Sequence, residues 1–219
     1  MKRILVTGGL GYIGSHTVLK LLKADYEVIV LDNLSNSSLE VNSSIKFLSN
    51  KKFDFIKDDL CYKKILNSIF SQFEIEAVIH FAGSKSSIES DRYPLEYYEN
   101  NVVGCINLFK EMANYDVKKI VFSSSATVYG ESNTKICKEN SKLSPISVYG
   151  KTKLIIENML KDIKKAQPEW RIINLRYFNP IGAHPSGMLG EYPKNIPNNL
   201  LLFLTQVAVG KKKRIACFW

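Results

Sequence analysis

The stretch RILVTGGLGYIGSH, residues 3–16, joins a β-branched run to a glycine-rich turn and to the start of an amphipathic pattern. Gly9, Gly11 and Gly14 match G-x-G-x-x-G, and Gly8 also allows the spacing G-x-x-G-x-x-G. Glycine permits a tight turn and lets the backbone approach a pyrophosphate, which then lies at the positive end of the following helix. The stretch therefore predicts a strand, a phosphate-binding turn and a helix in succession.

An acidic residue strengthens this interpretation. Asp32 ends the next β-branched run, 21 residues after Gly11. A carboxylate at that place accepts hydrogen bonds from a ribose diol and repels a 2′-phosphate, which favours NAD over NADP. A glycine turn that only packs a helix against a strand is the alternative.

Short β-branched runs alternate with helical patterns along most of the chain. This order predicts an α/β fold, a Rossmann-type doubly wound parallel sheet, in residues 1–176, followed by an incomplete substrate-binding region in residues 177–219. A proline-rich loop at 179–197 would cover the substrate, and an apolar helical run would follow it to Val209. The predicted strands are 3–7, 27–31, 53–57, 77–81, 119–123 and 171–176, and the predicted helices are 12–23, 61–73, 94–115 and 149–166.

Composition and residue spacing argue against several other classes of protein. The 219 residues are 45% hydrophobic, so the chain can bury a large core. The net charge of +9 comes from lysines spread along the chain without a nucleic-acid-reading motif, so we expect no nucleic-acid partner. We expect no membrane segment and a cytoplasmic location, because the apolar run at 200–204 is far shorter than the roughly 20 residues that cross a bilayer. The four cysteines and three histidines lack ligand spacing, so we expect no metal.

Tyr149 and Lys153 raise the question of proton transfer, since they stand four residues apart where a helical pattern begins. One helical turn places both side chains on the same face. Tyr115 and Lys119 share this spacing in an unremarkable segment, so the spacing alone does not separate a functional pair from two surface residues.

Several motifs occur together in a characteristic order: TGGLGYIGSH, LDNLSNS, HFAG, SSSATVYG, YGKTK and LRYFNPIGAHPSG. With them, the chain closely resembles the extended short-chain dehydrogenase/reductases, the NAD-dependent epimerase/dehydratase family, and within it the UDP-glucose 4-epimerase branch. The likeness runs from Met1 to about Ala216. It implies tightly bound NAD, UDP-glucose and UDP-galactose as substrates, and a 4-keto intermediate of galactose metabolism.

The resemblance assigns catalytic roles to three residues. Tyr149 would take the proton of the sugar 4-hydroxyl, and Lys153 would hold the nicotinamide ribose and favour the phenolate. Ser125 would bridge the substrate hydroxyl and the tyrosine, whereas Ser123 and Ser124 would satisfy hydrogen bonds at the strand end. Related dehydratases carry an Asp-Glu pair where this chain has Ala126 and Thr127, so elimination of water looks disabled.

The resemblance also implies ligand contacts and a partner. Members of this family often form homodimers through the two helices that correspond to 94–115 and 149–166. Substrate contacts would come from Ser125, Tyr149, Asn179 and Asn199. Cofactor contacts would come from Gly8, Gly11, Tyr12, Ile13, Gly14, Asp32, Asn33, Asp59, Leu60, Phe81, Ala82, Gly83, Lys85, Asn100, Ser125, Tyr149, Lys153 and Phe178.

The likeness fades at Cys217, before the remainder of the small C-terminal domain that grips the nucleotide in this family. We therefore expect a C-terminally truncated member that keeps the cofactor fold but has little or no epimerase activity, because remote binding energy positions the sugar. An NAD-binding module without catalysis and a related nucleotide-sugar reductase or dehydrogenase are the alternatives. The apolar helix near residue 200 would lose its cover, which predicts low solubility.

Overall fold

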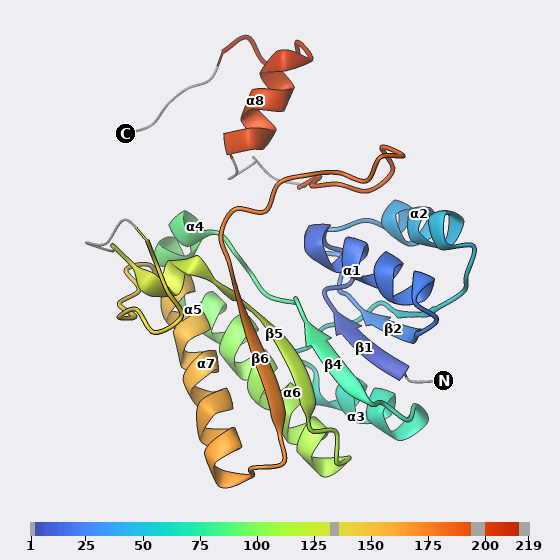
Figure 1. Cartoon of the computed structure of the whole chain (residues 1–219), viewed down its shortest axis with the longest axis vertical. Helices are drawn as coiled ribbons and strands as arrows, with labels where there is room; N and C mark the ends of the chain where they lie inside the picture. The colour runs from blue at the N-terminus through green and yellow to red at the C-terminus, as the bar shows by residue number, and fades with distance from the viewer. Residues whose placement is uncertain (1–2, 132–135, 194–199, 215–219) are drawn as a thin grey trace.

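The computed structural model describes residues 3–131, 136–193 and 200–214. Strands and helices alternate as expected through most of the chain (Figure 1). The strands are β1 (Arg3–Thr7), β2 (Glu27–Leu31), β3 (Asp54–Ile56), β4 (Ala77–His80), β5 (Lys119–Ser125) and β6 (Arg171–Tyr177). The α-helices are α1 (Tyr12–Lys23), α2 (Leu39–Ser49), α3 (Lys63–Gln72), α4 (Ser87–Arg92), α5 (Pro94–Tyr97), α6 (Gly104–Asn114), α7 (Val148–Ala166) and α8 (Leu200–Ala208).

The six strands form one parallel sheet in the order β3-β2-β1-β4-β5-β6. This arrangement confirms the predicted doubly wound sheet. Strand β1 lies between β2 and β4, and Val6 is in register with Val30 on one side and with Ile79 on the other. The strand order reverses beside β1, and ligands of such sheets bind outside the carboxyl ends of the strands at that reversal.

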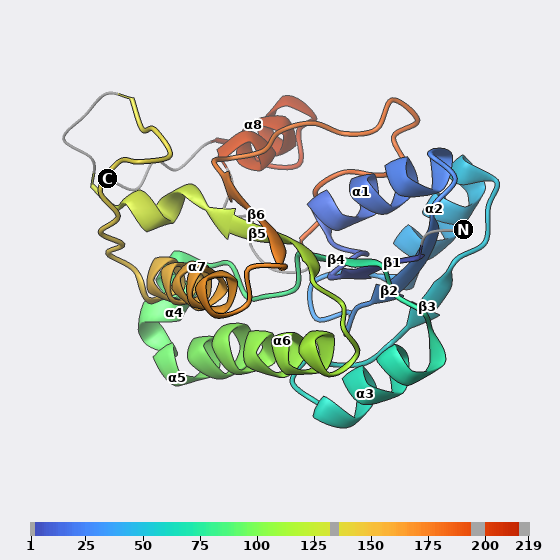
Figure 2. The same ribbon diagram turned by 60° about the horizontal axis from the view of Figure 1, so that its bottom comes forward.

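Helices cover both faces of the sheet (Figure 2). Helices α1 and α2 lie on one face, and α3, α6 and α7 lie on the other. Successive strand residues point to opposite faces, so Leu5 enters the core beneath α3 and α6, whereas Val6 enters the core beneath α1. Both residues are completely buried, which explains why the parallel strands are nearly continuous apolar runs.

Helix α2 was not predicted from the sequence. Its segment LEVNSSIKFLS contains three serines and one asparagine, which disfavour helix interiors, and Ile45 is its only buried residue. Contacts with α1 therefore hold this helix in place rather than its own propensity.

The predicted single helix at 94–115 is wrong in detail. The segment consists of α5, a π-helical turn at Tyr98–Val103 and α6. Tyr115 and Lys119, which share the spacing of Tyr149 and Lys153, do not lie on one helix, since Tyr115 caps α6 and Lys119 begins β5. Strands β5 and β6 extend to Ser125 and Tyr177, beyond their predicted ends, and β3, β4 and α3 are shorter than predicted.

The C-terminal part of the described chain is less enclosed than the sheet. No residue of α8 is buried, and Leu200 and Leu204 are exposed. The prediction of low solubility is not tested by this geometry and stays a prediction. In the described part of the chain, every helix is too short or too polar to cross a membrane.

Candidate active site

The glycine turn after β1 closes tightly on the rest of the sheet. Gly8 has a φ of +67°, and a Cβ there would lie 2.6 Å from the Ala82 backbone nitrogen. A Cβ on Gly14 would lie 2.2 Å from the Gly8 carbonyl oxygen. Gly11 is different, since its Cβ would meet only that carbonyl, at 3.3 Å. Two glycines are therefore required by backbone packing, while the outer side of Gly11 is open.

Gly11 is also the N-cap of α1, and no side chain caps the helix there. Tyr12 and Ile13 are the first two residues of this helix, so their amides have no acceptor within the helix. A helix start with free amides and no acidic side chain in its first turn favours an anionic ligand.

Asp32 lies at the end of β2 and is 8% exposed. Its carboxylate accepts hydrogen bonds from the Leu10 amide at 3.0 Å, the Leu34 amide at 2.9 Å and the Ser37 hydroxyl at 2.8 Å. The first of these bonds holds the glycine turn. Asp32 therefore shapes the turn, and the oxygen that accepts from Leu10 keeps capacity for another donor, such as a ribose hydroxyl.

Asn33 follows β2 and Asp59 follows β3, so both lie at the same carboxyl edge of the sheet as Asp32. The Asn33 amide donates to Asp59 at 2.7 Å, and the Cys61 backbone amide donates to the other carboxylate oxygen at 2.8 Å. Burial raises the pKa of Asp59, but these hydrogen bonds outweigh it and hold the pKa below its ordinary value. Leu60 beside it is buried in the core cluster.

Tyr149 and Lys153 lie on the buried face of α7, with 9% and 4% of their surfaces exposed. The Lys153 ammonium donates to the Ser123 carbonyl at 2.9 Å. It lies 4.9 Å from the Phe122 ring centroid and 5.8 Å from the Tyr149 ring centroid. The two predicted residues are thus together at the carboxyl end of β5, and the ammonium rests against aromatic faces.

The three serines at the end of β5 face different partners. The Ser125 Oγ accepts from the Thr127 amide at 3.2 Å and from the Thr127 hydroxyl at 2.9 Å, at the start of a short 3₁₀ turn, Ala126–Tyr129. Its own hydroxyl proton remains available for donation. Ser124 instead donates to Glu157 in the helix layer. Strand alternation therefore places Ser123 and Ser125 on the face opposite Ser124.

The π-helical turn positions two asparagines under the loop after β4. Buried Asn101 accepts from the Ser84 amide at 2.8 Å and donates to the Ser84 carbonyl at 3.0 Å and to Thr152 at 3.2 Å. Asn100 donates to the Ser84 hydroxyl at 3.2 Å. An inserted residue in a helix often marks a functional site, because it redirects side chains by part of a turn.

The same loop brings β4 close to β1 and α7. The amides of Phe81 and Ala82 both donate to the Thr7 carbonyl, at 2.9 and 3.2 Å. Gly83 has a φ of +147°, and a Cβ built there would lie 3.0 Å from Asn101 Oδ1 and 3.8 Å from Lys153 Nζ. Gly83 therefore marks a close approach of the loop to the predicted catalytic lysine.

The segment after β6 runs across the start of α1. The Tyr12 hydroxyl donates to the Gly182 carbonyl at 2.7 Å, and Leu189 is buried in the core beside α1. Lys85 forms an ion pair with Glu191 at 2.9 Å, which joins this segment to the loop after β4. Phe178 and Asn179 at its start are exposed. Asn199, another predicted ligand, lies outside the described residues.

Beneath the site lies a buried polar chain that the sequence did not predict. His80 contacts the Thr7 hydroxyl through Nδ1 at 2.6 Å and the Cys105 sulfur through Nε2 at 3.0 Å. Burial, with the nearby charge of Lys153, lowers the pKa of His80 to about 3. Burial raises the pKa of Cys105 to about 12. Both groups are therefore neutral at pH 7 and act in packing.

Sequence analysis also missed Asn101 and Glu157. Glu157 stands four residues after Lys153 and eight after Tyr149, so a carboxylate recurring on one helix face was a usable signal. Asn101 had no such signal, because its partners Ser84 and Thr152 lie far from it in the sequence.

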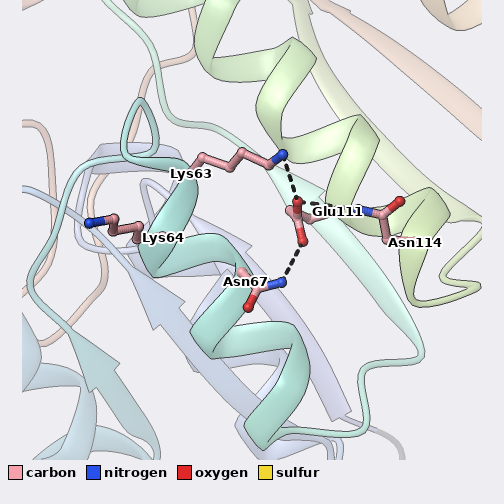
Figure 3. Close-up of a pocket in the computed structure, with 5 residues that line it drawn as sticks. All are labelled: Lys63, Lys64, Asn67, Glu111 and Asn114. Atoms are coloured by element: carbon pink, nitrogen blue, oxygen red, sulfur yellow. Dashed lines mark hydrogen bonds and ion pairs between the residues drawn. The ribbon is translucent and has the colours of Figure 1, made fainter.

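A separate cavity of about 470 Å³ lies between α3 and α6, within the helix layer (Figure 3). Its buried Glu111 accepts from Asn67 at 3.1 Å and from Asn114 at 3.3 Å, and Lys63 is 4.0 Å away. Because this carboxylate already has its partners and none of the predicted site residues lines the cavity, we assign it no part in the site.

Comparison with known proteins agrees with this arrangement. The model of the NAD dependent epimerase/dehydratase family matches residues 4–215. The chain belongs to this family.

Individual family members are similar over nearly the whole chain. The UDP-glucose 4-epimerases of Dictyostelium discoideum and Bacillus subtilis are 50% and 52% identical to it over 216 and 215 residues, which is 99% and 98% of this chain. The chain spans 63% of the length of each of these relatives.

Solved structures of the family superpose closely. The UDP-glucose 4-epimerase from Bifidobacterium longum, in complex with NAD+ and UDP, has a TM-score of 0.94 at 43% identity and is matched over 97% of this chain and 64% of its own. The enzyme from Stenotrophomonas maltophila, with bound NAD and formylated UDP-arabinopyranose, has a TM-score of 0.95 at 37% identity, over 98% of this chain and 64% of its own.

Proposed function

We propose that this chain binds NAD and carries the proton-transfer residues of a UDP-glucose 4-epimerase, which interconverts UDP-galactose and UDP-glucose. The observation that carries the proposal is the burial of Tyr149 and Lys153 together on helix α7, beside the carboxyl end of β5. The similar enzymes crystallised with NAD support the same assignment.

The residues present fit a dinucleotide. Gly8 and Gly14 leave no space for a side chain, so the backbone stays close-packed, while the outer side of Gly11 and the uncapped start of α1 are open to a pyrophosphate. Asp32 is placed for a ribose hydroxyl, and Asn33 with Asp59 would border the adenosine. When bound, NAD would supply the acceptor and donor of hydride that oxidation and re-reduction of the sugar require.

Tyr149 would remove the proton of the sugar 4-hydroxyl during oxidation and return it during reduction. The Lys153 ammonium favours the phenolate, because its contacts with the Ser123 carbonyl and the Phe122 ring leave its positive charge unneutralised. The Ser125 hydroxyl would donate a hydrogen bond to the substrate oxygen. Positioning of these groups lowers the barrier by fixing the geometry before reaction.

Elimination of water is a poorer fit. Ala126 and Thr127 occupy the 3₁₀ turn beside Ser125, and the Thr127 hydroxyl donates to Ser125. Neither side chain can act as the carboxylic acid or carboxylate that dehydration would need at this place. Oxidation and re-reduction at one carbon are what the remaining groups support.

The test uses the purified 219-residue chain and the variant Tyr149→Phe. We expect NAD⁺ to bind both proteins in titration calorimetry. Because this chain spans 63% of its relatives' length, we expect its conversion of UDP-galactose to UDP-glucose to be slow at most, and absent in Tyr149→Phe, as followed by chromatography of the nucleotide sugars. Tyr115→Phe is the matched control, because Tyr115 shares the spacing to a lysine but lies at the end of α6. It should behave as the wild type.

Each result separates the alternatives. NAD⁺ binding without conversion would replace the proposal by a binding module, and net formation of free NADH would replace it by a dehydrogenase. Failure to bind NAD⁺ would overturn the cofactor assignment itself. Conversion by Tyr149→Phe at the wild-type rate would remove Tyr149 from the mechanism.

We also propose pairing of two chains through the helix layer. Exposed apolar side chains lie along it, including Leu95 (81% exposed), Val103 (44%) and Ile155 (36%). Sedimentation equilibrium should give a dimer that Leu95→Asp with Ile155→Asp converts to a monomer. A wild-type monomer at 100 μM would refute the pairing.

A further inference from the structure

A charged pair next to the site has no role in the proposed chemistry. Glu157 on α7 and Arg176 on β6 are joined by an ion pair of 2.7 Å, with 6% and 19% of their side chains exposed. The bond is bidentate, since the Arg176 Nε also donates to Glu157 at 3.0 Å. The fixed fork of a guanidinium constrains the orientation of both partners more than a single lysine contact would.

The pair connects three further segments. The Ser124 hydroxyl donates to Glu157. The Arg176 Nη1 donates to the Tyr129 hydroxyl at 3.1 Å and to the Glu139 carbonyl at 2.9 Å. One ion pair thus ties the ends of β5 and β6, the 3₁₀ turn and the segment around residue 139 to helix α7.

Three of the connected residues lie next to residues of the proposed site. Ser124 precedes Ser125, and Glu157 follows Lys153 by one helical turn. Tyr129 stacks on Phe178, with ring centroids 6.4 Å apart. Movement of the ion pair would therefore change the position of Ser125 relative to the α7 pair and the position of Phe178 at the edge of the site.

Stability does not explain such a pair well. Two buried charges lose hydration that their attraction only partly replaces, and a well-packed apolar pair is often as stable or more stable. The hydrogen bonds of this pair are directional and link five segments. They therefore fix one relative placement of those segments, which apolar contacts do not.

We propose that Glu157 and Arg176 are positioning residues that hold the β5 end, the 3₁₀ turn and the β6 end in register with Tyr149 and Lys153. This deepens the proposed function, on which its catalytic meaning depends. The placement itself is a property of the folded chain and can be measured without substrate.

The decisive variant is the double substitution Glu157→Met with Arg176→Met, which fills the space without leaving one charge unpaired. The matched control is Arg3→Met with Glu27→Met, an ion pair of 2.6 Å that joins β1 and β2 at the opposite end of the sheet. Thermal unfolding establishes that each variant folds. Hydrogen exchange by mass spectrometry then reports on peptides covering 119–131, 138–141 and 171–178.

In the double variant we expect these peptides to exchange at least about tenfold faster, with peptides of β1 and α1 unchanged and the unfolding temperature within a few degrees of the wild type. The control should leave the three peptides as they are. Arg176→Lys keeps the charge but loses the fork, so the increase should be confined to 126–131 and 138–141. Exchange within threefold of the wild type in the double variant would overturn the proposal.

A second measurement concerns catalysis and separates this inference from the function. If the wild type converts UDP-galactose, the double variant should lose about 100-fold in kcat with KM within threefold, because a displacement near 1 Å at a reacting group costs about that much. Unchanged kcat would overturn the catalytic part of the inference. If the wild type proves inactive, the proposed function fails, while the exchange result still confirms or refutes the positioning role.

Discussion

Gly14→Ala tests the packing of the glycine turn directly. An added methyl group would lie 2.2 Å from the Gly8 carbonyl oxygen and 2.9 Å from the Gly9 Cα. Ordinary contact begins at 3.4 Å, so the turn and α1 would have to separate by about 1.2 Å. The obstacle is backbone on both sides, and no flexible side chain can move aside. By helix propensity alone the substitution would stabilise α1 by about 1 kcal/mol, so the two effects oppose each other.

Overpacking of this kind costs about 1–3 kcal/mol, and we expect the upper end because backbone must shift. With about 2–4 °C per kcal/mol for a chain of this size, the unfolding temperature without ligand should fall by roughly 4–8 °C after the propensity gain is subtracted. Gly11→Ala is the control, since its Cβ would meet one atom at 3.3 Å, and it should unfold within about 2 °C of the wild type while losing NAD⁺ affinity. Differential scanning calorimetry decides the matter. A Gly14→Ala protein as stable as Gly11→Ala would refute the packing argument.

Three further outcomes follow from buried polar groups. Because the pKa of His80 is lowered to about 3, the unfolded chain binds a proton below pH 6.5 that the folded chain does not, so stability should fall by about 2 kcal/mol between pH 7 and pH 5. Urea titrations at several pH values should show this fall in the free energy of unfolding for the wild type but not for His80→Gln. Asp32→Ala should destabilise the ligand-free chain by about 2–3 kcal/mol in the same assay, because buried donors on Leu10, Leu34 and Ser37 lose their acceptor. Lys153→Met should leave stability unchanged or raise it by about 1 kcal/mol while abolishing sugar conversion, and a loss of more than 2 kcal/mol would show that the ammonium is structural.

Periodicity predicted the centre of the sheet well because strands such as β1 and β2 are buried on both faces. Runs such as RILVT and EVIVL have no other stable environment, and the connecting helices then fix a parallel order. The glycine turn could be predicted equally well, since Gly8 and Gly14 each meet a separate steric requirement, while Gly11 leaves the outer side of the turn open. Local rules suffice where one residue type satisfies one local constraint.

Features that depend on partners distant in the sequence could not be predicted from it. Helix α2 is held by α1, and the π-helical turn is held by Asn101, whose partners Ser84 and Thr152 lie on other elements. Glu157 could have been suspected from its helix face, but its partner Arg176 is 19 residues away on a strand. No local pattern couples such positions, so the geometry of the site had to come from the tertiary structure.

Helix α7 separates two kinds of buried charge along one face. Glu157 is paired with Arg176, so that charge is internally balanced. Lys153, one turn earlier, has no carboxylate within 4.0 Å among the described residues and is supported by a carbonyl and aromatic rings. Such contacts replace only part of the lost hydration. An unbalanced ammonium therefore costs folding free energy. In the proposed mechanism this cost would be recovered when a negative charge develops on the Tyr149 oxygen. The balanced Glu157–Arg176 pair one turn away would hold the strand ends in place during that step, so the helix would combine a rigid support with a site whose positive charge is balanced only during the reaction.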